Sequence, residues 1–442
     1  MLIRYGASSH LSICDYQEIS CAASKLKDDE RHLIKIVGRS LQGDFLPVIA
    51  LYGANAAGKS NMVDALRFMQ WLIEYSYRNG RDKKKINIQS CKIRGTKTTA
   101  LSTYDCDVLI ENVRHHYGFE CNDEGFVREW LFSFPNGSKT VLFERDFSAE
   151  SKKKIYFGPT VKGVDKTLQD LAGNEKALFL SSAGQTSHEI FKPIHSYFSN
   201  RFVNISRHDT PYFDDSIISG LGDKVIRGAV ESVLRQADFG ISAIEVIESP
   251  VPDESKILRS KLMKLFAEIS SSEDVPLEEE DTEKRVVFTH GYGDESFKLQ
   301  LTEESTGTVH LIKLLVPTIL ALREGKTLII DEITTTLHTK LSEELIKLFS
   351  NAETNPRNAQ FIFTTHDTNL LSQGVLRRDE VWFVEKSEDL KTSVFPLTDF
   401  KTRKSDNLEN GYLLGRYGAI PTFGDLTRAV AAAVRQTNSV ES

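Results

Sequence analysis

The 442-residue sequence predicts an α/β fold in which a parallel sheet is covered by helices. A short apolar run at 47–52 stops at Gly53, as a buried central strand does. After Ser60, apolar residues recur at three-to-four spacing, which predicts a helix. Further apolar runs at 327–330 and 361–363 are separated by another helical pattern. This alternation is typical of a parallel sheet with helices on its faces.

Other parts of the chain predict an antiparallel β subdomain. Short apolar clusters within 1–44 favour strands joined by turns. Apolar and polar residues alternate at 105–110, 115–119 and 130–134, with turn-forming residues between these stretches. We therefore expect antiparallel hairpins in addition to the parallel sheet.

The middle of the chain predicts an insertion. Apolar residues recur at helical intervals over roughly 155–250, whereas 249–284 is acidic and rich in serine and is expected to be mobile and solvated. A hairpin is expected where the core resumes near Arg285. The predicted organisation is an N-terminal part of the core at 1–154, a helical insertion with an acidic linker at 155–284, and a C-terminal part of the core at 285–442.

Composition and charge narrow the functional class. Hydrophobic residues make up 40% and charged residues 26% of the chain, an ordinary globular balance. The formal net charge of −7 lacks the overall excess of positive charge that is typical of proteins that bind nucleic acid. The apolar runs are too short to cross a bilayer and the N-terminus lacks a signal-peptide pattern, so we expect a cytoplasmic protein without a membrane partner. The five cysteines lack zinc-site spacing and are expected to be reduced.

The motif with the most specific chemistry reads Gly-Ala-Asn-Ala-Ala-Gly-Lys-Ser and ends at Ser60. It fits the G-x-x-x-x-G-K-[ST] pattern of a P-loop, in the required place between a strand and a helix. Lys59 is expected to reach the β- and γ-phosphates of ATP and to act in catalysis, and Ser60 to ligate Mg²⁺. A chance glycine-rich turn is the alternative. The predicted nucleotide-binding residues are Gly53, Asn55, Ala57, Gly58, Lys59, Ser60 and Asn61.

A pair of carboxylates follows the apolar run at 327–330. Asp331 is expected to hold Mg²⁺, directly or through water, and Glu332 to orient or deprotonate the attacking water. Both would lie at the sheet edge where α/β folds bind ligands. Taken alone, such a pair is better explained as a solvated helix cap, but beside a P-loop it favours a catalytic site.

His366 follows the apolar run at 361–363 and is expected at the same sheet edge. A histidine there is placed to contact the γ-phosphate, so we add it to Glu332 and Lys59 as a catalytic candidate. By itself, a histidine in this position is more often a strand-end cap or a hydrogen-bonded, partly buried side chain.

These motifs and four further segments resemble the AAA-family, ABC-like ATPases related to RecF, SMC and OLD proteins. Within that group, the chain is most similar to the bacterial abortive-infection or phage-defence ATPases. Glu304-Ser305-Thr306-Gly307-Thr308 resembles a degenerate signature motif, and Leu337-His338 the neighbourhood of a D-loop. The other two segments are 377–383 and 411–421, and the latter ends in the most specific run, Gly-Arg-Tyr-Gly-Ala-Ile-Pro.

The resemblance implies an ABC-type P-loop ATPase head that forms a head-to-head dimer or higher oligomer. Ser305 and Gly307 of one subunit would then close over ATP bound by the P-loop of the other. A hydroxyl and free N–H groups at a helix start suit that role, and an ordinary N-capped helix is the alternative. Two features depart from the family pattern: Thr334-Thr335-Thr336 stands where relatives usually carry an aspartate, and Gln89 is a weak candidate for the Q-loop glutamine.

Two functions compete. The first is an ATP-hydrolysing sensor or scaffold of antiviral defence that controls a separate effector, expected to be a nuclease, because the sequence shows no Asp-rich nuclease cluster and no appended TOPRIM-like block. The second is a DNA-binding repair or maintenance ATPase, which the acidic charge disfavours. A self-contained nuclease around Arg201, Arg207, His208 and Asp209 is a weaker third hypothesis. Basic clusters at 83–85 and 152–154 are better explained as solvated loops than as nucleic-acid sites.

Overall fold

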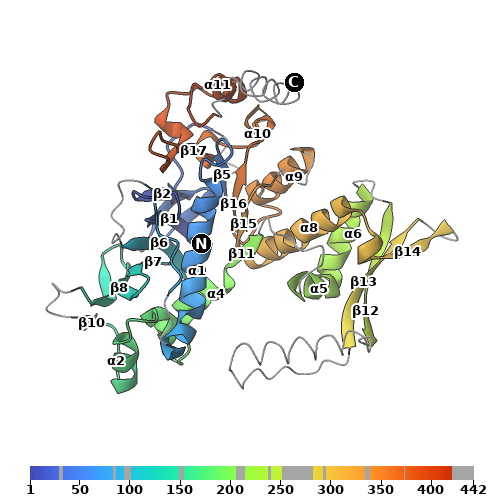
Figure 1. Ribbon diagram of the computed structural model, residues 1–442. Helices are drawn as coiled ribbons and strands as arrows, with labels where there is room; N and C mark the ends of the chain where they lie inside the picture. The colour runs from blue at the N-terminus through green and yellow to red at the C-terminus, as the bar shows by residue number, and fades with distance from the viewer. Residues whose placement is uncertain are drawn as a thin grey trace, which may run out of the picture. The chain divides into compact units, whose positions relative to one another are not determined.

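The computed structural model divides the chain into two compact units (Figure 1). Unit 1 comprises Met1–Ile205 and Glu324–Ser442, and unit 2 comprises Ser206–Arg323. The residues that the structure describes are 1–28, 33–82, 86–93, 101–148, 154–205, 215–236, 240–250, 282–291, 295–333, 339–372 and 374–420.

A six-stranded sheet in unit 1 has the order β11-β15-β16-β5-β17-β18, and all neighbouring strands are parallel except β17 and β18. Its strands are β5 (Val48–Tyr52), β11 (Phe202–Ile205), β15 (Thr327–Ile330), β16 (Gln360–Thr365), β17 (Val381–Lys386) and β18 (Thr392–Pro396). Every residue of β5, β15 and β16 is buried, which is why each strand contains an apolar run. The predicted parallel sheet is confirmed, and these three strands end where the predicted site residues begin.

The second large sheet of unit 1 is antiparallel and has the order β10-β9-β8-β7-β6-β1-β2. Its strands are β1 (Leu2–Ser8), β2 (Gln17–Ser20), β6 (Ser102–Ile110), β7 (Val113–Asn122), β8 (Gly125–Ser133), β9 (Thr140–Asp146) and β10 (Ile155–Phe157). A separate hairpin joins β3 (Ile34–Val37) to β4 (Gln42–Phe45). The antiparallel subdomain predicted from alternation is therefore confirmed.

Helix α1 (Lys59–Asp82) starts at the P-loop and crosses the core of unit 1 (Figure 1). Its buried face includes Met62, Leu66 and Met69, at the predicted three-to-four spacing. One apolar cluster joins this face to residues of both large sheets, such as Ile329 and Tyr104, so packing holds the helix start in place. The other α-helices among the described residues of unit 1 are α2 (Lys166–Ala172), α3 (Phe179–Ala183), α4 (Phe191–Asn200), α9 (Thr339–Ser350), α10 (Asn369–Ser372) and α11 (Leu408–Leu413).

Unit 2 combines helices with the three-stranded antiparallel sheet β12-β13-β14. The helices and strands that the structure describes in this unit include α5 (Asp215–Gly222), α6 (Lys224–Gln236), β12 (Ile241–Pro250), β13 (Thr282–His290), β14 (Phe297–Gln300) and α8 (Thr306–Glu324). Helices α5 and α8 approach closely at Gly220, where a Cβ would lie 2.5 Å from Val316 Cγ1, so this contact requires glycine. The predicted hairpin near Arg285 is present as β13 and β14.

Helix α8 is the one helix among the described residues with the length and apolar composition of a membrane span, with a mean hydropathy of 1.2. Buried residues make up 67% of that window, including Leu311, Ile312 and Val316. Burial of this extent is that of a core helix in a globular unit.

The domain boundaries predicted from the sequence differ from those of the two units. Residues 155–205 belong to unit 1, because β10 pairs with β9 and β11 pairs with β15. Residues 285–323 belong to unit 2, because β13 pairs with β12. The insertion therefore corresponds to Ser206–Arg323 rather than to 155–284. Most of the predicted acidic linker lies outside the described residues.

Cys14 and Cys91 form a disulfide, with their Cα atoms 5.3 Å apart. The expectation that all cysteines are reduced is wrong for this pair, which is separated by 77 positions in the sequence. The two segments meet because Leu11 N–H donates to the Gln89 carbonyl oxygen at 2.7 Å, a contact that cysteine spacing does not reveal. Cys21, Cys106 and Cys121 are free and buried, as expected.

Candidate nucleotide site

The P-loop joins β5 to α1, as the sequence predicts. Lys59 Nζ donates to the carbonyl oxygens of Gly53, at 2.8 Å, and Ala54, at 3.0 Å. Gly53 and Ala57 are buried, whereas Asn55 and Ser60 are exposed. The loop therefore curls around the ammonium group of Lys59 and leaves Asn55 and Ser60 accessible to a ligand.

Close contacts with β17 and β18 explain the two glycines of the motif. A Cβ at Gly58 would lie 2.1 Å from Thr392 Oγ1, and the φ of Gly58 is +110°, which disfavours any other residue. A Cβ at Gly53 would lie 2.2 Å from the Val384 carbonyl oxygen. The loop can follow its path only because both positions lack a side chain.

The hydroxyl groups of Thr392 and Ser12 form hydrogen bonds that support the loop. Thr392 Oγ1 donates to the Ala57 carbonyl oxygen at 2.9 Å and lies 2.6 Å from Ser12 Oγ. Asn61 Nδ2 donates to the same Ser12 oxygen at 2.5 Å. Asn61, predicted to bind nucleotide, is thus engaged behind the loop in this structure. Sequence reasoning did not find Ser12 or Thr392, since both are distant from the motif along the chain.

The C-terminal run that the sequence singled out contacts the P-loop. Ala54 N–H donates to the Ala419 carbonyl oxygen at 2.9 Å, and the Tyr412 hydroxyl donates to the same oxygen at 2.9 Å. Ala419 N–H in turn donates to Glu385 Oε1, just beyond the buried part of β17, at 3.2 Å. Two N–H groups of the loop are therefore bonded to protein, because Ala57 N–H also donates to the Ala54 carbonyl oxygen, at 3.2 Å.

Asp331 lies beside the start of α1, and the structure brings both predicted magnesium ligands together. Ser60 Oγ donates to Asp331 Oδ1 at 3.1 Å. Thr364, in β16, donates its hydroxyl to the same oxygen at 2.7 Å and accepts the Glu332 N–H at 2.7 Å. Thr364 had no role assigned from the sequence. Its place at the end of a strand, just before His366, is the signal that would have indicated it.

Glu332 and His366 also meet. Glu332 has a φ of +64°, a left-handed conformation that is uncommon for a residue with a side chain. Glu332 Oε1 lies 3.1 Å from His366 Nδ1, with 14% of the glutamate and 52% of the histidine side chain exposed. Backbone strain of this kind persists where surrounding structure enforces it, often at functional sites.

A partly buried arginine, Arg67 of α1, stands behind the acidic pair. Its Nη2 donates at 2.5 Å to the Ile205 carbonyl oxygen, which also accepts the Asp331 N–H at 3.5 Å. Burial lowers the pKa of Arg67, and the nearby carboxylates of Asp331 and Asp64 act in the opposite direction. Arginine remains ionised in proteins, so a positive charge faces this side of Asp331. No spacing in the sequence marked Arg67.

Ser305 and Gly307 lie in unit 2 at the start of α8, and both are exposed. Ser305 Oγ accepts the Thr308 N–H at 3.1 Å, so it caps the helix. Glu304 Oε1 lies 2.5 Å from His290 Nε2, which fixes the residue before the cap. The geometry is that of an N-capped helix with an accessible first turn, and contact with a partner's nucleotide stays a prediction.

Several sequence predictions fall outside the described residues: 83–85, 152–153, 207–209, 334–336 and 337–338. Gln89, the candidate Q-loop residue, is exposed, and its carbonyl oxygen accepts the Leu11 N–H. The side chain of Arg201 donates to the Glu324 carbonyl oxygen.

The residues at this sheet edge fit a nucleotide and Mg²⁺. Ser60 and Asp331 place hard oxygen donors side by side, the ligand type that Mg²⁺ prefers. Lys59 and the helix start supply positive charge for phosphate. Fold and site together define a nucleotide-binding protein of the P-loop class.

A family model described as "AAA domain, putative AbiEii toxin, Type IV TA system" matches residues 48–372. The chain belongs to this AAA-domain family, and the resemblance predicted from the motifs is confirmed. The match contains the P-loop, the acidic pair and His366. A search of the curated proteins finds no match.

Three similar solved structures are head domains of SMC proteins. The SMC head domain from Thermotoga maritima is 13% identical, with a TM-score of 0.39 over 89% of this chain and 98% of that chain. An SMC head bound to the C-terminal winged-helix domain of ScpA is 12% identical, with a TM-score of 0.38 over 90% and 98%. An SMC head with an extended coiled coil, bound to a ScpA domain and derived from Pyrococcus furiosus, is 11% identical, with a TM-score of 0.36 over 90% and 97%.

Proposed function

We propose that this protein binds ATP with Mg²⁺ and hydrolyses it. The observation that supports the proposal is a continuous chain of contacts beside the P-loop. It runs from Ser60 to Asp331, through Thr364 to Glu332, and on to His366. A lysine for phosphate, two oxygen ligands for a metal and a carboxylate for water thus share one sheet edge.

Each residue has a distinct role in this proposal. Lys59 and the free N–H groups of the loop bind the phosphates, while Ser60 and Asp331 hold Mg²⁺, which neutralises charge on the phosphate oxygens when bound. Glu332 orients the attacking water and accepts its proton on a carboxylate oxygen. His366 keeps that carboxylate in position through Nδ1 and leaves its other ring nitrogen for the γ-phosphate.

Two substitutions in the full-length chain test the proposal. Glu332→Gln should retain ATP affinity while lowering kcat by about 100-fold or more, since it removes the proton acceptor. Lys59→Ala should abolish ATP binding, measured with a fluorescent analogue. Unchanged turnover in Glu332→Gln would refute the assignment of the general base.

We further propose that two subunits associate head to head around ATP. The exposed first turn of α8, with Ser305 and Gly307, supports this proposal because it offers a hydroxyl and N–H groups to a partner's γ-phosphate. Light scattering should show that Glu332→Gln dimerises only with Mg-ATP. The double variant Glu332→Gln, Ser305→Arg should stay monomeric with Mg-ATP. As a control, Thr302→Arg on a neighbouring exposed residue should leave the ATP-dependent dimerisation of Glu332→Gln intact. A Glu332→Gln protein that stays monomeric with ATP would contradict the model.

The biological role that we propose is a cytoplasmic sensor or scaffold of antiviral defence that controls a separate toxic effector. The family description, which names a toxin of a type IV toxin–antitoxin system, supports this setting. Affinity purification from the native host, with and without phage infection, should recover one stoichiometric partner with nuclease or toxin activity. Recovery of the bare homo-oligomer under both conditions would count against the proposal.

A further inference from the structure

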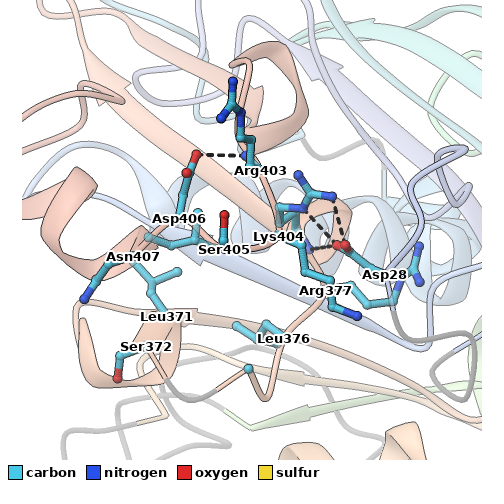
Figure 2. Close-up of a pocket in the computed structure, with 13 residues that line it drawn as sticks. Asp28, Leu371, Ser372, Leu376, Arg377, Arg403, Lys404, Ser405, Asp406 and Asn407 are labelled. Carbon is cyan, nitrogen blue, oxygen red and sulfur yellow. Dashed lines mark hydrogen bonds and ion pairs between the residues drawn. The ribbon is translucent and has the colours of Figure 1, made fainter.

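A pocket apart from the nucleotide site lies in unit 1, between α10 and the turn that precedes α11 (Figure 2). Its volume is about 450 Å³, within the range of small-molecule sites. None of the residues assigned above to the nucleotide site lines it. Its ionisable lining residues are Asp28, Arg377, Arg378, Arg403, Lys404 and Asp406.

Two of these arginines build the pocket and are already neutralised. Arg378 donates to both carboxylate oxygens of Asp28, at 3.0 and 2.8 Å. Arg377 donates twice to Asp379, each time at 2.9 Å. Paired and largely buried side chains of this kind stiffen the wall, so the pocket is formed before any ligand arrives.

Arg403 and Lys404 differ from Arg377 and Arg378, because the side chains of Arg403 and Lys404 are exposed. In the part of the chain that the structure describes, neither side chain is paired with a carboxylate. Asp406 is engaged by the backbone, since its Oδ2 accepts the Arg403 N–H at 2.8 Å (Figure 2). The lining thus carries two cations without acidic partners beside an apolar wall of Leu371 and Leu376.

We propose that this pocket binds a small phosphate-bearing molecule with a planar or apolar portion, of the nucleoside monophosphate type. A doubly charged phosphate would accept charge-assisted hydrogen bonds from Arg403 and Lys404. The planar portion would cover Leu371 and Leu376, while the Ser372 hydroxyl, which donates to the Asn369 carbonyl oxygen at 2.8 Å, can accept a hydrogen bond from its polar edge. Combined apolar and cationic walls of this kind favour such a ligand over a bare anion.

The elements on both sides of the pocket are connected to the nucleotide site, so the ligand is expected to change ATP turnover. Helix α10 begins three residues after His366, and Thr368 Oγ1, just before this helix, donates to Glu409 Oε1 of α11 at 3.0 Å. Tyr412, also in α11, donates to the Ala419 oxygen that accepts the P-loop N–H of Ala54. A molecule in this pocket would therefore contact α10, which is joined in sequence to His366, and the start of α11, whose Tyr412 donates to the Ala419 oxygen beside the P-loop.

The test measures AMP binding by calorimetry in the full-length Lys59→Ala protein, whose P-loop no longer binds phosphate. AMP should bind saturably with one site per chain, adenosine should not bind, and inorganic phosphate should bind more weakly. Arg403→Glu and Lys404→Glu should each lower AMP affinity by about tenfold or more, because each removes a charge-assisted hydrogen bond. Lys401→Glu, exposed but outside the lining, is the matched control and should bind AMP normally.

Four results would overturn the proposal: no saturable AMP binding, equal binding of adenosine, equal binding of inorganic phosphate, or AMP binding that survives both substitutions. Because AMP binding is measured in a protein without a working P-loop, a negative result would contradict the pocket proposal but would not bear on the proposed ATPase activity. In the protein with Lys59 intact, AMP should change kcat for ATP, and Lys404→Glu should remove that change.

Discussion

The Thr364 hydroxyl donates to Asp331 Oδ1 at 2.7 Å and, through the same oxygen, accepts the Glu332 N–H at 2.7 Å. One buried side chain on β16 therefore orients both acidic residues that follow β15. The proposed metal ligand and the proposed general base share a single support, which holds Glu332 in its left-handed conformation.

Thr364→Val should lower the affinity of the ATP complex for Mg²⁺ by about tenfold, because the partly buried carboxylate of Asp331 loses a hydrogen bond worth about 1–3 kcal/mol. Valine keeps the branched shape, so the packing of β16 should survive. Magnesium titrations of ATP binding measure the effect, and Thr364→Ser, which restores the hydroxyl, should recover most of it. A valine variant with normal magnesium affinity would show that Thr364 does not position Asp331.

The sequence was sufficient to predict that the P-loop, Asp331, Glu332 and His366 lie at one sheet edge, because each follows a buried strand and parallel strands bring such ends to the same edge. It did not reveal the side chains that support them. Ser12 and Thr392 reach the loop from distant parts of the chain, and only tertiary packing unites them.

The limits of the insertion were not predictable for a similar reason. Strand β11 has only four residues and follows helix α4 closely, so the helical pattern concealed an edge strand of the parallel sheet. The hairpin of β13 and β14 was correctly predicted, but its partner β12 lies before the acidic stretch, and pairing across such a distance leaves no local signal.

Gly58→Ala should destabilise the protein by about 1–3 kcal/mol and weaken ATP binding, since a Cβ would lie 2.1 Å from Thr392 Oγ1 at a strained φ. Thr392→Ala removes that oxygen and should restore part of the lost stability in the double variant. Urea unfolding of the wild type, both single variants and the double variant gives the coupling energy. Strictly additive effects would mean that the predicted clash does not occur.

Arg145→Met should cost about 3–5 kcal/mol of unfolding free energy, because it leaves Glu129 as a buried, unpaired charge. Arg145 Nη2 lies 2.6 Å from Glu129 Oε2, and both side chains are fully buried. Arg128→Met is the matched control: its pairs with Glu120 and Asp146 are partly exposed, and its loss should cost less than about 1 kcal/mol. Chemical denaturation compares the two, and equal losses would contradict the burial argument.

Acidification should destabilise unit 1 through His195. Burial lowers the pKa of this imidazole, and a Cβ at Gly184 would lie 2.1 Å from its Cγ, so the ring is tightly enclosed. The backbone of Ile73 opposes the shift through a hydrogen bond. Because the folded pKa lies below the unfolded value near 6.5, the unfolded chain binds the proton more tightly. Stability from this group is therefore complete above about pH 6.5 and is lost as the pH falls through the folded pKa.

His195→Gln should flatten this dependence, because glutamine does not titrate. One proton changes the unfolding free energy by at most about 1.4 kcal/mol per pH unit, which sets the largest difference in slope between the two proteins. Burial lowers the pKa of His115 as well, so the variant should retain part of the acid sensitivity. Urea unfolding between pH 8 and 5 measures both slopes. If the variant and the wild type lose stability in parallel, His195 is not a source of the acid sensitivity, and the burial of its ring does not disfavour its protonation.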